Sequence, residues 1–174
     1  MANGTLKVEN IQTSSGSGTI TLGQSGETIA LGASSISGFG KVGQVVQSVI
    51  ATTQNTTSTS YVTSNLSASI TPSTTSSKIL VILSGGNAHN NTNNANVLVA
   101  FYRDGSVLNN DPHGIIQNTS GTNSFKLSWS ASYLDSPAST SSLTYVPYYK
   151  VSSGTGHFNE ATVSVQLTLM EILG

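Results

Sequence analysis

The sequence predicts an all-β protein in two parts. Residues 1–40 are expected to form a short β repeat segment that acts as a trimeric shaft or anchor, and residues 41–174 a jelly-roll-like antiparallel β-sandwich head. Three observations support this: apolar and polar residues alternate in several segments, no window has the apolar spacing of a helix, and turn-forming residues separate the segments.

The first 40 residues contain an internal repeat. Residues 19–27 (TITLGQSGE) are followed directly by residues 28–36 (TIALGASSI), and each copy presents only two apolar side chains on one face. This is too little to form a core, so three chains are expected to wind the repeats around a common axis; a disordered linker is the alternative. The predicted core residues of this trimer or anchor are Leu6, Val8, Ile11, Ile20, Leu22, Ile29 and Leu31.

Three segments of the head alternate as half-buried strands do. Residues 125–133 and 163–169 alternate strictly, and residues 62–70 do so with an interruption at Ser64. Each is predicted to turn one face to the core and one to solvent.

Two further segments, residues 79–83 (ILVIL) and 97–101 (VLVAF), are apolar on both faces. Strands of this kind need a cover on each side. A second sheet is expected to supply one cover and a neighbouring subunit the other. Asp104 and Gly105 follow the second segment and predict a type I′ hairpin turn to a short strand near Val107.

Tyrosines gather on one expected strand, at Tyr145, Tyr148 and Tyr149. Their rings suit either sugar stacking or packing in the sandwich or a subunit interface, and packing is the preferred interpretation. Pro147 lacks a backbone N–H, which indicates an edge strand or a bulge at that point.

Charge is scarce. Only 7% of the 174 residues are charged and the net charge is -1, so the basic field that nucleic-acid binding needs is missing and no nucleic-acid partner is expected. No apolar run is long enough for a membrane span, and the amino terminus has no signal-peptide pattern, so neither membrane insertion nor export is predicted. Without cysteine there are no disulfides.

Residues 41–174 contain few side chains that could act as catalytic acids or bases. The carboxylates are Asp104, Asp111, Asp135, Glu160 and Glu171, and each is more simply interpreted as a turn or strand-flanking residue than as half of a catalytic pair. We therefore predict no catalytic residue, no cofactor and no enzyme activity.

The three histidines, His89, His113 and His157, lie in three different polar loops of the sequence. They could bind a transition metal if those loops met, or one histidine from each chain could do so on a threefold axis. Loop histidines are usually solvated, so no metal site is predicted, although sequence leaves the axial arrangement open.

Several segments of the chain are similar to fibre proteins of tailed bacteriophages, particularly those of marine and freshwater viruses of the cyanophage kind. The similarity extends over most of the chain and lies in the order and spacing of short motifs. These are residues 4–11 (GTLKVENI), 40–47 (GKVGQVVQ), 70–72 (ITP), 76–81 (SSKILV), 102–105 (YRDG), 134–138 (LDSPA) and 167–172 (LTLMEI).

The resemblance implies a virion structural protein. Such fibres are typically homotrimers without cofactors, in which the amino-terminal part attaches to other virion proteins and the distal head meets the host surface. The chain departs from them by lacking a long shaft. A capsid head fibre or decoration protein without a receptor role is therefore one alternative, and a small carbohydrate-active enzyme is a second.

For the fibre interpretation, loops 87–94, 109–113 and 154–159 are the expected contact surface for a host glycan or protein, because hydroxyl and amide groups hydrogen-bond sugars. The candidate residues are Asn87, His89, Asn90, Asn91, Asn93, Asn94, Asn109, Asn110, His113 and His157.

Overall fold

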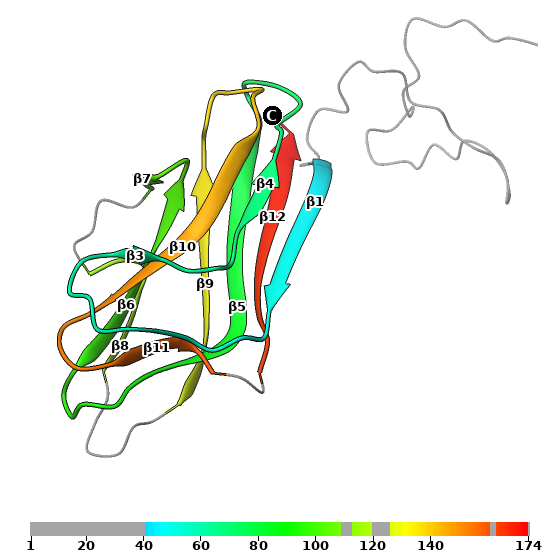
Figure 1. Ribbon diagram of the computed structural model, residues 1–174. Helices are drawn as coiled ribbons and strands as arrows, with labels where there is room; N and C mark the ends of the chain where they lie inside the picture. Colours follow the sequence, from blue (N-terminus) through cyan, green and yellow to red (C-terminus); the bar gives the residue numbers. More distant parts are fainter. Residues whose placement is uncertain (1–40, 109–112, 120–125, 161–162, 174) are drawn as a thin grey trace, which may run out of the picture. The chain divides into compact units, whose positions relative to one another are not determined.

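The computed structural model describes residues 41–108, 113–119, 126–160 and 163–173 (Figure 1). Across these ranges every regular element is a β-strand, which confirms the all-β prediction. The predicted repeat segment and its seven core residues lie outside the described residues. Among the described residues, the model contains no helix with the length and apolar character of a membrane span.

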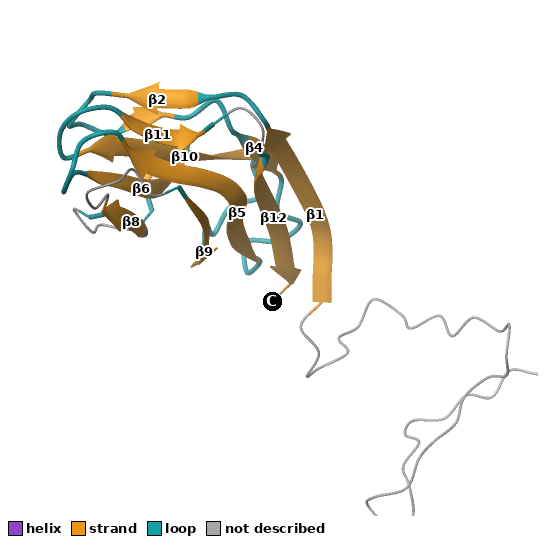
Figure 2. Ribbon diagram, turned by 90° about the horizontal axis from the view of Figure 1, so that it is seen from below, coloured by secondary structure: helices purple, strands orange, loops and turns teal. Residues whose placement is uncertain are grey.

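The first sheet is antiparallel. Its main strands lie side by side in the order β1, β12, β5 and β9, and β11 and β2 extend the sheet beside the far end of β5 (Figure 1). Both ribbon views show β1 at the outer edge, next to β12 (Figure 2). The bounds are β1 (Lys41–Ile50), β2 (Gln54–Thr56), β5 (Lys78–Asn90), β9 (Leu127–Asp135), β11 (Gly156–Asn159) and β12 (Val165–Leu173).

The second sheet is built around β10 and β6, which pair over most of their lengths. Two short strands, β3 and β4, share the other side of β10, and β7 and β8 pair with the other side of β6. The bounds are β3 (Val62–Thr63), β4 (Ala68–Ile70), β6 (Asn96–Arg103), β7 (Ser106–Val107), β8 (Ile116–Thr119) and β10 (Leu143–Val151).

One core joins the two sheets. Side chains of β12 and of the first half of β5 alternate, so that Val81 and Leu167 are fully buried while their neighbours are only partly buried. They belong to the same cluster as Phe101 and Tyr145 of the second sheet. The head is therefore a β-sandwich held together by period-two apolar faces.

The hairpin prediction after β6 is confirmed. Asp104 and Gly105 both have positive φ, at 48° and 81°, as a type I′ turn requires, and β7 follows at once.

A subunit cover over residues 97–101, expected from the sequence, is not needed, because the chain covers β6 itself. The outward-facing Leu98 is only 5% exposed. Tyr102 and Tyr148 stack on that face with ring centroids 3.9 Å apart, and Tyr61 packs against Tyr102 at 6.1 Å.

The expected strand over residues 62–70 is split into β3 and β4 by Ser64, whose backbone N–H donates to the carbonyl of Pro147 at 3.1 Å. The prediction of an edge strand or a bulge at Pro147 is therefore wrong, because β10 has neighbouring strands on both sides. The backbone nitrogen of Pro147 faces the gap between β3 and β4, so the sheet loses no hydrogen bond there. Tyr145 and Tyr149 lie in the core, as the packing interpretation predicts.

Candidate functional site

A β-bulge interrupts β5 before its last residues. Gly85 and Gly86 both have positive φ, and the pairing with β9 shifts register between Gly85 and Ala88. The backbone N–H of Gly86 donates to the carbonyl of Ser164 at 2.7 Å, which anchors the bulge to the segment before β12. The strand then continues to Asn90.

Two of the three loops predicted from the sequence are therefore partly strand. The loop expected over residues 87–94 begins only at Asn91, because β5 continues to Asn90; it then extends to residue 95, before β6 begins at Asn96. Most of 154–159 forms β11. Local composition could not predict this, since glycines and histidines in these strands are held by pairing with distant segments.

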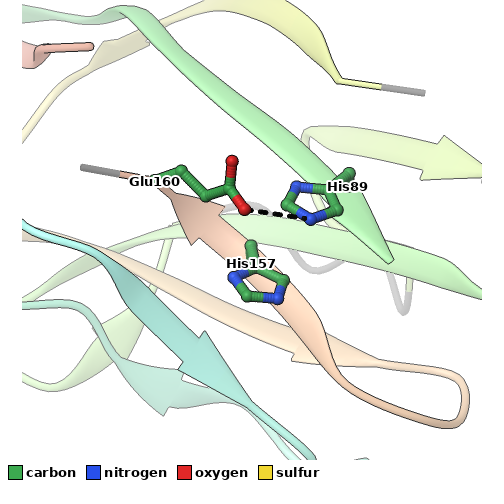
Figure 3. A group of neighbouring side chains, drawn as sticks. All are labelled: His89, His157 and Glu160. Carbon is green, nitrogen blue, oxygen red and sulfur yellow. Dashed lines mark ion pairs between the residues drawn. The ribbon is translucent and has the colours of Figure 1, made fainter. Parts of the chain in front are cut away.

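The extension of β5 places two histidines face to face. His89 of β5 is the register partner of His157 of β11, and their imidazole rings stack with centroids 4.2 Å apart and planes 5° apart (Figure 3). His89 is 2% exposed, and His157 is half-buried.

Glu160 completes this group. It follows β11 directly, and its side chain turns back toward the rings (Figure 3), with Oε1 lying 3.5 Å from His89 Nε2. Its Oε2 forms an ion pair with Lys126, and its backbone N–H donates to Asn87 Oδ1 at 3.1 Å. One potential ligand atom from each of the three side chains lies within 4.8 Å of the others. We call His89, His157 and Glu160 the imidazole–carboxylate cluster.

Burial and the contact with Lys126 determine the charges of the three side chains in the cluster. Burial lowers the pKa of His89, and the neighbouring His157 lowers it further; burial also lowers the pKa of His157. The hydrogen bond from Lys126 lowers the pKa of Glu160. At neutral pH the cluster therefore contains two neutral imidazoles and one ionised carboxylate.

Both imidazoles have a buried Nδ1 atom without a hydrogen-bond partner among the described residues. Buried polar atoms are usually paired, so two unpaired ring nitrogens in adjacent side chains are unusual.

The other predicted contact residues divide into buried and exposed sets. Asn90 is 1% exposed and holds the turn by donating to the Ser153 carbonyl at 2.9 Å and accepting from Thr92 N–H. Asn91, Asn93 and Asn94 are exposed in the loop that follows.

His113 is exposed and does not belong to the cluster, so the structure brings together two of the three histidines. Asn109 and Asn110 lie outside the described residues. Glu160 was considered in the sequence only as a strand-flanking carboxylate. Its proximity to His89 arises from the pairing of β5 with β11, and no local sequence signal reports that pairing.

Two other carboxylates have partners within the fold. Asp135 Oδ2 accepts hydrogen bonds from Arg103 and Tyr145. Glu171 accepts from Ser73 and Gln44. These contacts tie strands together, and neither carboxylate belongs to the cluster.

No family model matches the chain, and no curated protein matches it with significance.

Proposed function

We propose that the chain is a virion structural protein, a homotrimeric fibre or tail appendage of a bacteriophage whose β head contributes to attachment to the host surface. Residues 1–40 would connect the head to other virion proteins. The resemblance of several sequence motifs to those of phage fibre proteins supports this assignment, and the outer face of the first sheet is the structural observation that supports association of the chains.

That outer face carries an apolar row across four strands. The ladder pairs Val45 of β1 with Met170 of β12, Met170 with Leu80 of β5, and Leu80 with Leu134 of β9. Val45 and Leu134 are 55% and 50% exposed. Register partners lie on the same face, so the row is continuous.

The row extends along the edge strand. Val42 and Val49 of β1 are also about half-exposed, and Ile82 of β5 lies half-buried beside the row. Contiguous exposed apolar patches on soluble proteins mark interaction sites. A second copy of the same chain is the partner that a homotrimer provides, and this supports the expectation that residues 79–83 are covered by a neighbouring subunit.

Attachment to a host also needs an exposed polar surface. The side-chain amides of Asn91, Asn93 and Asn94, which are exposed at the end of the sandwich, provide such a surface. Amide groups donate and accept hydrogen bonds without charge. Contacts made by such a surface depend little on salt, which suits binding in fresh water or seawater.

Immunogold labelling of phage particles whose genome encodes the chain tests the assignment, with antibody raised against the full chain. Label at the tail or its fibres is expected. Label spread over the capsid shell would favour the decoration protein instead, and particles without label would contradict both. Release of reducing ends from host polysaccharide by the purified chain would favour a carbohydrate-active enzyme, since a binding protein releases none.

A further inference from the structure

We infer that the imidazole–carboxylate cluster is a binding site for a divalent transition-metal ion of the zinc class, formed within a single chain by His89, His157 and Glu160. This site is independent of the proposed function. It also differs from an axial arrangement, in which each chain of a trimer contributes one histidine.

The donor set fits such an ion. Two imidazoles and one carboxylate are ligands of many zinc sites, with a fourth position left to water or another ligand. Two ligands about 2.0–2.1 Å from a tetrahedral zinc ion lie about 3.4 Å from each other. The 3.5 Å between His89 Nε2 and Glu160 Oε1 matches that spacing.

Strand pairing holds the backbone around the ligands. The ladder between β5 and β11 keeps His89 and His157 opposite each other. Glu160 is oriented by two contacts that leave Oε1 available: its backbone N–H donates to Asn87, and its Oε2 pairs with Lys126. A neutral partner such as Asn87 orients a metal ligand and strengthens binding, whereas the positive charge of Lys126 repels a bound cation.

Imidazole is the commonest metal ligand among protein side chains, and a neutral ring offers one nitrogen lone pair to the ion. The ligand atom of His89 that faces Glu160 is Nε2; in His157, Nε2 contacts Asn91, and the buried Nδ1 has no partner among the described residues and is available as a ligand.

Because the two imidazole rings are stacked, one of them must move before both can bind the same ion. Lone pairs of imidazole lie in the ring plane, and two parallel planes share no point, so both rings cannot bind one ion as they stand. His157 is the less buried ring and is in contact with the exposed Asn91 at 3.3 Å. Metal binding is therefore expected to turn the His157 ring out of the stack.

Calorimetric titration of the full chain with Zn²⁺ tests this, after treatment with a chelator and in a buffer that does not bind metals. Saturable binding of one ion per chain is expected. The variants His157→Gln and Glu160→Gln should each weaken binding by at least about tenfold. His113→Gln is the matched control and should leave the affinity unchanged, because His113 is exposed and outside the cluster.

Lys126→Ala is expected to bind Zn²⁺ more tightly, and a misfolded variant would not show tighter binding. Removing the ammonium group from Glu160 should raise the affinity for Zn²⁺ several-fold, because like charges repel. Circular dichroism verifies that each variant is folded. The inference is overturned by absence of saturable binding, by one ion for every three chains, by equal weakening in His113→Gln, or by weaker binding in Lys126→Ala.

Discussion

Glu171 shows how this charge-poor protein uses a carboxylate inside its fold. The residue is 1% exposed, and its carboxylate accepts two hydrogen bonds from Ser73, both at 2.6 Å, and one from Gln44 at 2.8 Å. Burial alone would raise its pKa, but these hydrogen bonds outweigh burial and lower the pKa to about 2. The carboxylate therefore ties β1 and the 71–77 loop to β12.

Glu171→Gln is predicted to destabilise the head in a pH-dependent way. The folded pKa of about 2 lies below the ordinary value of 4.5, so the contribution of the carboxylate is complete above pH 4.5 and disappears as pH falls toward 2. The shift corresponds to at most about 3 kcal/mol. Urea denaturation of both proteins between pH 2 and 7 measures it. Two stability curves separated by a constant amount over this whole range would contradict the prediction.

At the scale of elements, a buried polar contact links the two sheets. Asp135 of β9 in the first sheet accepts from Tyr145 of β10 at 2.7 Å and from Arg103 of β6, both in the second sheet. Asp135 is 7% exposed and Tyr145 fully buried. Removing a carboxylate here leaves a buried hydroxyl and a guanidinium without their acceptor.

Asp135→Ala is therefore predicted to lower the free energy of unfolding by about 3 kcal/mol, and Tyr145→Phe by only about 1 kcal/mol, since Asp135 keeps Arg103 in the second variant. Equilibrium denaturation of the two variants beside the unmodified chain measures both losses. Equal losses would show that the ion pair adds nothing to the hydroxyl contact.

The bulge in β5 yields a second prediction at this scale. Gly85 and Gly105 have nearly the same φ, at 79° and 81°, but a Cβ at Gly85 would lie 2.5 Å from the carbonyl oxygen of Ser164, whereas a Cβ at Gly105 meets nothing within 4 Å. Gly105→Ala should cost about 1 kcal/mol from backbone strain alone, and Gly85→Ala clearly more. Thermal unfolding compares them, and similar losses would mean that the bulge relaxes freely.

Elements with a strong local pattern could be predicted from the sequence. The alternation before the carboxyl end became β12, and Asp104-Gly105 formed the expected turn. The end of β5 and the whole of β11 could not be predicted, because Gly85-Gly86 and Gly154-Thr155-Gly156 resemble turns in isolation. The imidazole–carboxylate cluster depends on their pairing, so the sequence placed its histidines in separate loops.

At the scale of the whole molecule, the outer apolar row of the first sheet is left exposed by the part of the chain that the structure describes. The second sheet covers its own outer face with tyrosines, whereas the first exposes Val45 and Leu134. This asymmetry predicts association through the first sheet.

Val45→Lys is predicted to weaken the proposed homotrimer and shift it toward monomers, because three lysines would be brought into the apolar interface between the heads. Val107→Lys is the matched control: this valine is 40% exposed but belongs to β7 of the second sheet, so the trimer should persist. Size-exclusion chromatography with light scattering compares the variants. A trimer that survives Val45→Lys would place the interface elsewhere.

Sedimentation equilibrium of the unmodified full chain at micromolar concentration measures its association most directly. A mass three times the 17.9 kDa of one chain is predicted. A folded single chain at that concentration would contradict the trimeric fibre.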